Sequence, residues 1–155
     1  KSATKKLIEI DPRNSETYQQ NLQALLNKIK VLSKKIEKQV APLQTQDYLV
    51  FHDAYSHYSD RFGLKHATAV TINPAIKPGA ARLRNLQELV RSRDIACAFS
   101  EPQFDDRFLK TITSTVPVRI GMLDPIGAIV PPGPDAYLII LSGITETLVN
   151  CLGQK

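Results

Sequence analysis

The chain has 155 residues, of which 43% are hydrophobic and 23% are charged. These proportions are typical of a folded globular domain and exclude a disordered chain. No apolar run approaches the ~20 residues that a transmembrane helix needs. The net charge of +5 is modest and accompanies no recognisable nucleic-acid-binding module, so we expect no nucleic-acid partner.

The first part of the chain, residues 1–43, is predicted to be helical. A short helix is expected over residues 1–10, and Asp11-Pro12 ends it because the residue before a proline disfavours helical geometry. Apolar residues then recur at steps of three and four, with lysines between them as a solvated face. This spacing predicts one long amphipathic helix over residues 14–41.

The remainder, residues 44–155, alternates between strand-like and helical patterns and is predicted to form one α/β lobe. The predicted strands are Tyr48–Phe51, Ala67–Ile72, Ile95–Phe99 and Val116–Leu123. A helical pattern follows each strand, and the last one covers Tyr137–Leu152. Such alternation implies parallel pairing with right-handed crossovers. The expected fold is a four-stranded parallel sheet flanked by helices and preceded by the long helix.

Polar residues stand where each predicted strand ends, namely His52, Asn73, Glu101 and Asp124. The carboxyl ends of parallel strands lie along one edge of a sheet, where open α/β folds bind ligands. A lone histidine is more often a surface or satisfied core residue. At this position, however, a neutral imidazole would be a good zinc ligand.

Each of the acidic residues near these strand ends has two possible roles. Asp53 can cap the next helix, which we favour, or orient a histidine. Glu101 and Asp124 can accept hydrogen bonds from turn backbone, or face the crevice as oxygen ligands. Asn73 is expected to be a turn residue, and His57 and His66 are expected to be solvated.

The two cysteines, Cys97 and Cys151, are far apart in the sequence. Two cysteines alone do not make a four-ligand zinc site. They fit a disulfide in an oxidising compartment, and they fit equally two buried free thiols of a cytosolic protein.

Four motifs resemble, in their order, the high-affinity zinc-binding proteins of bacterial ABC uptake systems, the ZnuA type. They are Phe51-His52-Asp53-Ala54-Tyr55, Asn73-Pro74 with Pro78-Gly79-Ala80, Ser100-Glu101-Pro102-Gln103-Phe104 and Leu123-Asp124-Pro125-Ile126-Gly127. The resemblance covers essentially the whole chain. It implies two α/β lobes joined by a long helix, with the metal held between them.

The resemblance also implies roles for individual residues. His52 matches a zinc ligand, and Asp124 matches an aspartate near the metal that is a ligand in manganese-binding relatives. Those relatives usually have glutamate in place of His52, so the histidine favours zinc over manganese. Ligand softness agrees, because imidazole suits zinc and carboxylate suits manganese. Cys97 and Cys151 match cysteines that form a disulfide in some zinc-binding members.

We therefore expect a C-terminal lobe with its connecting helix, from a periplasmic protein that delivers zinc to an inner-membrane ABC permease and catalyses no reaction. The chain begins at Lys1 without a methionine, and the family's other histidine ligands are missing. The first lobe is thus expected upstream. Zinc binding by this part alone is expected to be weak, because a tetrahedral shell needs further ligands.

Two alternatives remain open. His52, Glu101 and Asp124 would serve a metal-dependent hydrolase if all three held one catalytic ion. Alternatively, the long N-terminal helix would make the chain a helical interaction module. The apolar stripe along residues 18–40 also makes dimerisation or swapping plausible.

Overall fold

The computed structural model describes residues 1–154 and divides the chain into two compact units, Lys1–Lys35 and Ile36–Lys155. The first unit holds α1 (Ser2–Ile10), the short η1 (Pro12–Asn14) and the start of α2 (Ser15–Val40). The sequence-based prediction of a break at Asp11-Pro12 and of one long helix afterwards is confirmed. Asp11 stabilises the turn, because its carboxylate accepts hydrogen bonds from Asn14 (2.8 Å) and Tyr18 (2.7 Å).

The second unit begins with the end of α2, where Ile36 and Val40 are buried. The elements that follow are η2 (Ala41–Leu43), β1 (Leu49–His52), α3 (Ser56–Phe62), β2 (Thr68–Thr71), α4 (Ala80–Ser92), β3 (Cys97–Ser100), α5 (Arg107–Thr113), β4 (Arg119–Met122) and α6 (Ala136–Leu152). None of the helices within residues 1–154 combines the length and apolar character needed to cross a bilayer.

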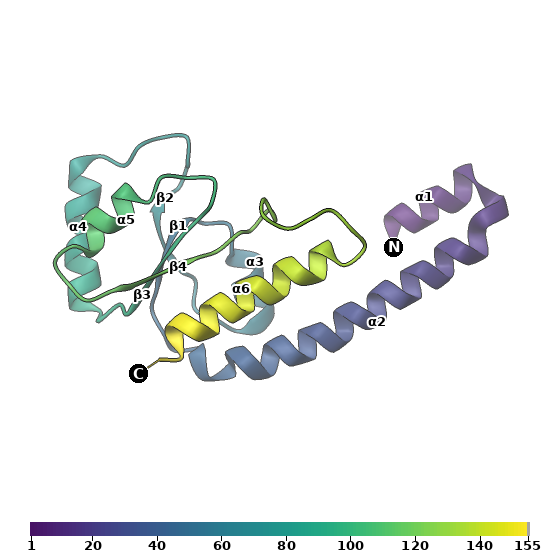
Figure 1. Ribbon diagram of the computed structural model, residues 1–155, viewed down its shortest axis with the longest axis horizontal. Coiled ribbons are helices and arrows are strands. Elements are labelled where there is room, and N and C mark those ends of the chain that lie inside the picture. Colours follow the sequence, from purple (N-terminus) through teal and green to yellow (C-terminus); the bar gives the residue numbers. More distant parts are fainter. Residues whose placement is uncertain (155) are drawn as a thin grey trace. The chain divides into compact units, whose positions relative to one another are not determined.

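The four strands form one parallel sheet in the order β2-β1-β3-β4, which confirms the predicted fold class. Helices α4 and α5 cover one face of this sheet and α6 lies on the other (Figure 1). Leu49 and Phe51 of β1 belong to the core cluster that includes Leu86 of α4 and Leu109 of α5. Because side chains alternate along a strand, Val50 and His52 project from the opposite face.

A disulfide between Cys97 and Cys151 joins β3 to α6, with the two Cα atoms 6.1 Å apart. Both cysteines are buried. The bond confirms the pairing that the family resemblance implied. Of the two interpretations that the sequence left open, a disulfide or two free thiols, it supports the disulfide.

Two elements differ from the sequence-based expectation. β4 begins at Arg119 rather than Val116, because Pro117 has no N–H to donate and the N–H of Val118 bonds to the carbonyl of Val116. Phe104 has helical spacing with later apolar residues, but α5 begins only at Arg107. Phe104 is therefore free to pack elsewhere.

Candidate metal centre

Three polar side chains lie at the carboxyl edge of the sheet. His52 ends β1, Glu101 follows β3 and Asp124 follows β4 by two residues. Since β1 pairs with β3 and β3 pairs with β4, all in parallel, these residues lie along one edge. This is the arrangement that the sequence predicted for them.

His52 and Glu101 contact each other directly. Nδ1 of His52 lies 2.7 Å from Oε1 of Glu101. The histidine side chain is 23% exposed, whereas the glutamate side chain is only 1% exposed. Burial raises the pKa of Glu101 above its ordinary value, and the charge and hydrogen bonding of His52 oppose this shift without cancelling it.

An aromatic pair supports the histidine from the side. Phe104 makes an edge contact with the imidazole, with ring centroids 5.7 Å apart and planes at 79°. Phe104 also stacks on Phe51 at 4.8 Å. The ring of His52 is thus fixed by an electrostatic contact at one nitrogen and by packing against Phe104.

Asp124 organises the loop that follows β4. Its Oδ1 accepts a 3.0 Å hydrogen bond from the side-chain amide of Gln103, and its Oδ2 accepts one of 3.0 Å from the N–H of Ile129. Partial burial would raise the pKa of Asp124, but the backbone donors of Ile129 and its neighbours, together with Gln103, outweigh burial and lower it. The carboxylate is therefore held ionised and oriented.

Tyr55 lies between β1 and α3, three residues after His52. Its side chain is buried. Burial raises the pKa of Tyr55, with further contributions from the negative charges of Glu101 and Asp124.

The segment between β3 and α5 connects the two predicted ligands. Glu101 and Phe104 contact His52, and Gln103 contacts Asp124. Sequence reasoning missed the contributions of Gln103, Phe104 and Tyr55. A signal was present, since all three belong to motifs on which the family resemblance rests.

The remaining sequence candidates lie outside this cluster. The expected capping role of Asp53 is wrong, because α3 begins at Ser56 with Tyr55 as N-cap and no side-chain capping bond. Asn73 is a turn residue as expected, with its side chain accepting from the N–H of Ala75. His57 is exposed, and His66 is an exposed partner of Asp60.

Within residues 1–154, no group of three or more histidine, cysteine, aspartate or glutamate side chains is placed to hold a metal ion. The structure thus brings His52 and Glu101 into contact, but it does not gather His52, Glu101 and Asp124 into one group of that kind.

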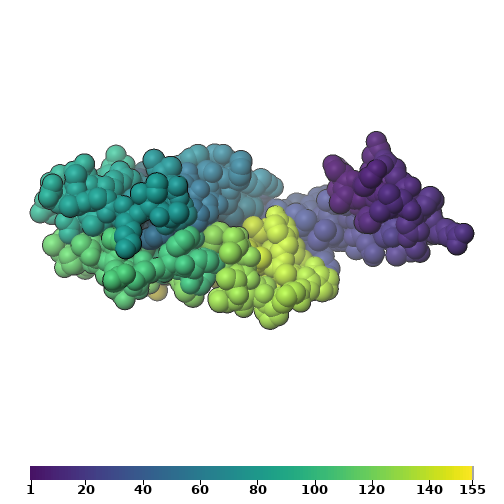
Figure 2. Space-filling model, turned by 90° about the horizontal axis from the view of Figure 1, so that it is seen from above, coloured from purple at the N-terminus to yellow at the C-terminus, as the bar shows by residue number. Residues whose placement is uncertain are grey.

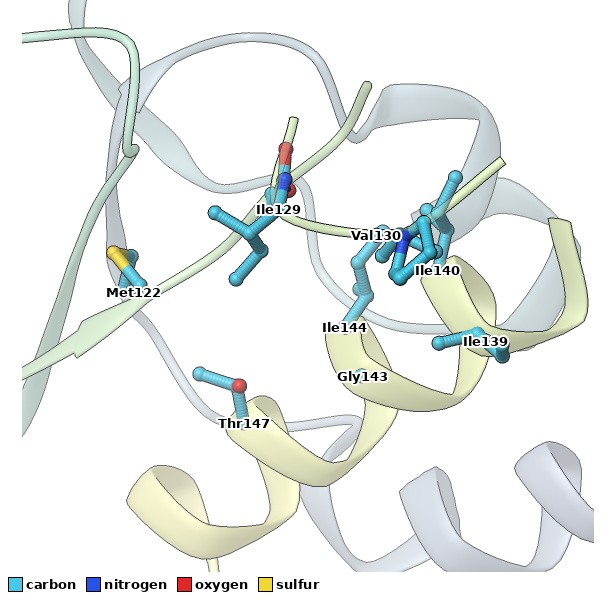
Figure 3. A pocket seen from close by; sticks show the side chains of 10 residues that line it. Met122, Ile129, Val130, Ile139, Ile140, Gly143, Ile144 and Thr147 are labelled. Atoms are coloured by element: carbon cyan, nitrogen blue, oxygen red, sulfur yellow. The ribbon is translucent and has the colours of Figure 1, made fainter. Parts of the chain in front are cut away.

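An apolar cavity of about 320 Å³ adjoins Asp124, between β4, the β4–α6 loop and α6. Figure 2 shows the loop and α6, in green to yellow, meeting at the surface. In Figure 3, Met122 of β4 and Ile129 of the loop face Ile144 and Thr147 of α6 across the cavity. Ile129 therefore lines this cavity with its side chain while its N–H holds Asp124.

The sequence matches proteins of zinc uptake. A family model described as "ZnuA: Zinc-uptake complex component A periplasmic" matches residues 1–151. The high-affinity zinc uptake system protein ZnuA of Brucella suis biovar 1 (strain 1330) is 35% identical over 150 residues, which are 97% of this chain and 45% of that protein. ZnuA of Yersinia pestis is 33% identical over 95% of this chain and 46% of its own length. The chain thus spans about half the length of these curated relatives.

Solved structures share the fold. A crystal structure of ZnuA superposes with a TM-score of 0.83 over 97% of this chain and 53% of that chain, at 21% identity. The Zn(II)-bound E280Q variant of AdcAII from Streptococcus pneumoniae superposes with a TM-score of 0.81 at 27% identity, covering 97% of this chain and 54% of that one.

Proposed function

Since this chain belongs to the ZnuA family of periplasmic zinc-uptake components, we propose that it supplies part of a zinc-capture site in a solute-binding protein. His52 is the proposed zinc ligand and Asp124 the second candidate. The observation that carries this proposal is the partly exposed imidazole of His52 at the carboxyl end of β1, with Nδ1 engaged by Glu101. In this proposal Nε2 is the nitrogen that binds the metal.

Zinc is the cargo of this site and undergoes no reaction there. Neutral imidazole and ionised carboxylate are both suited to Zn²⁺. The lowered pKa of Asp124 supports its role, because a ligand must be deprotonated to bind. We propose that the remaining ligands come from a first lobe outside these residues, and that this chain alone binds zinc weakly.

The organisation follows from the same proposal. Residues 1–43 would form the connecting helical segment and residues 44–155 the lobe that carries His52. Delivery to an inner-membrane ABC permease and a periplasmic location are part of the proposal. The Cys97–Cys151 disulfide supports the location, because disulfides persist in oxidising compartments.

The hydrolase alternative has less support from the geometry. It requires Glu101 to bind the same ion as His52 and Asp124. Instead, Glu101 is buried, and its Oε1 is already in contact with Nδ1 of His52. The interaction-module alternative has no feature in its favour beyond the apolar stripe of the long helix.

Calorimetric zinc titration of the full-length protein tests the proposal. His52→Ala should lower the affinity by on the order of a hundredfold or more, above the ~10–100-fold that outer partners contribute. His57→Ala is the matched control, because His57 is an exposed histidine on α3. Equal affinities of the two variants would refute the assignment of His52. Tight stoichiometric binding by the isolated 155-residue chain would refute the need for a first lobe.

A further inference from the structure

We propose that Glu101 is a positioning residue, which fixes the tautomer and orientation of His52 so that Nε2 faces the metal. This inference rests on the proposed function, since it concerns how His52 is prepared to bind zinc. It assigns to Glu101 neither a ligand role nor a turn role, the two roles that the sequence offered.

The first argument is the geometry of the hydrogen bond, in which Nδ1 of His52 and Oε1 of Glu101 are 2.7 Å apart. In this proposal Glu101 is ionised and can only accept, so Nδ1 is the nitrogen that carries the hydrogen. A neutral imidazole has a single N–H, which leaves the lone pair on Nε2. This lone pair is what binds zinc. Metal-binding histidines commonly donate the N–H of their other ring nitrogen to a carboxylate, which fixes the tautomer.

The second argument is the difference in exposure between the two side chains. Glu101 is 1% exposed, whereas the histidine side chain is 23% exposed. An ion arriving from solvent therefore meets the imidazole and not the carboxylate. The glutamate acts through the histidine.

The third argument is rigidity. Glu101 and Phe104 belong to one short segment after β3, and both contact His52. Phe104 is in turn stacked on Phe51 of the core cluster. Rotation of the imidazole would break the contact with the carboxylate and disturb this packing, so the segment holds the ring in one orientation.

Asp53 is the natural competitor, because it adjoins His52 in sequence. Its side chain is exposed, and the carboxylate that contacts Nδ1 of the imidazole is that of Glu101. Asp53→Asn therefore serves as a matched control for Glu101→Gln, since both remove one negative charge close to His52.

The test combines nitrogen NMR of the imidazole with zinc titration, both on the full-length protein. In the zinc-free wild type at neutral pH, we expect a protonated Nδ1 and an unprotonated Nε2, with the His52 signals identified by their loss in His52→Ala. Glu101→Gln should give a mixture of tautomers, because an amide can accept or donate. It should also weaken zinc binding by about 10–100-fold. Asp53→Asn should change neither measurement.

The outcomes separate this inference from the proposed function. A wild-type His52 protonated at Nε2 would overturn the positioning role without requiring any variant to fold. An unchanged tautomer and unchanged zinc affinity in a folded Glu101→Gln protein would also overturn it, while His52 could still be a ligand. If His52→Ala binds zinc as wild type does, the proposed function fails and the positioning role fails with it, whatever tautomer is seen.

Discussion

Gln103 donates a 3.0 Å hydrogen bond to Asp124, and so connects the segment after β3 to the loop after β4. The same segment contacts His52 through Glu101. His52 and Asp124, the two candidate zinc ligands, are thus both held by the segment after β3, although they are far apart in the sequence. A change in this segment should affect the proposed zinc site more than it affects the stability of the fold.

Gln103→Ala is expected to lower zinc affinity in the full-length protein, because Asp124 loses one of its orienting donors. The free energy of unfolding should fall by about 1 kcal/mol, the usual net loss for one hydrogen bond. Gln87→Ala is the control, since Gln87 also donates through its side chain, to the carbonyl of Thr111. Equal zinc affinities of the two variants, measured by calorimetry, would argue against the shared support.

Much of this site could be predicted from the sequence. The alternation of strand and helix places His52, Glu101 and Asp124 at strand ends, and parallel pairing brings those ends to one edge. The contact between His52 and Glu101 could not be predicted in this way. It depends on β1 lying next to β3, and strand order is set by packing rather than by local pattern.

The position of Phe104 illustrates a second limit. Its spacing is helical, but turn chemistry delays the helix, because Asp105 accepts a hydrogen bond from the N–H of Arg107. Phe104 therefore packs on His52 instead of on the next turn of α5. Apolar periodicity alone does not predict such a turn. It therefore assigns Phe104, which contacts His52, to the wrong element.

Removal of the Cys97–Cys151 disulfide should destabilise the protein without abolishing the fold. The two residues are 54 apart in sequence, so the bond closes a long loop of the unfolded chain. The expected loss is about 2–4 kcal/mol in the free energy of unfolding. Urea unfolding of wild type with and without reductant measures it, and Cys97→Ala/Cys151→Ala should match the reduced wild type. No effect of reductant would contradict the prediction.

Tyr58 should make stability depend on pH in the alkaline range. Its hydroxyl lies 2.7 Å from Oγ1 of Thr145, which itself donates to the carbonyl of Leu141, so the phenol is the donor. Burial raises the pKa of Tyr58 to about 12, and the bond to Thr145 opposes the shift only in part. An unfolded tyrosine titrates near pH ~10.

Because the folded pKa of Tyr58 is the higher one, its contribution to stability is complete below pH ~10 and is lost as the pH rises towards about 12. The free energy of unfolding should therefore fall more steeply over this range in wild type than in Tyr58→Phe. Tyr137→Phe, at an exposed position of α6, should follow wild type. Parallel pH profiles of wild type and Tyr58→Phe would contradict the expectation.

Gly127→Ala should disturb the loop that holds Asp124. Gly127 has φ of +71°, a conformation that costs other residues about 1–2 kcal/mol. An added Cβ would also lie 2.5 Å from Cδ1 of Ile140, one of the residues that line the apolar cavity. Since the N–H of Ile129 in the same loop donates to Asp124, zinc affinity should fall together with the melting temperature. Gly133→Ala is the control, because a Cβ there meets nothing within 4 Å. A Gly127→Ala protein that melts and binds zinc as the control does would show that this loop does not position Asp124.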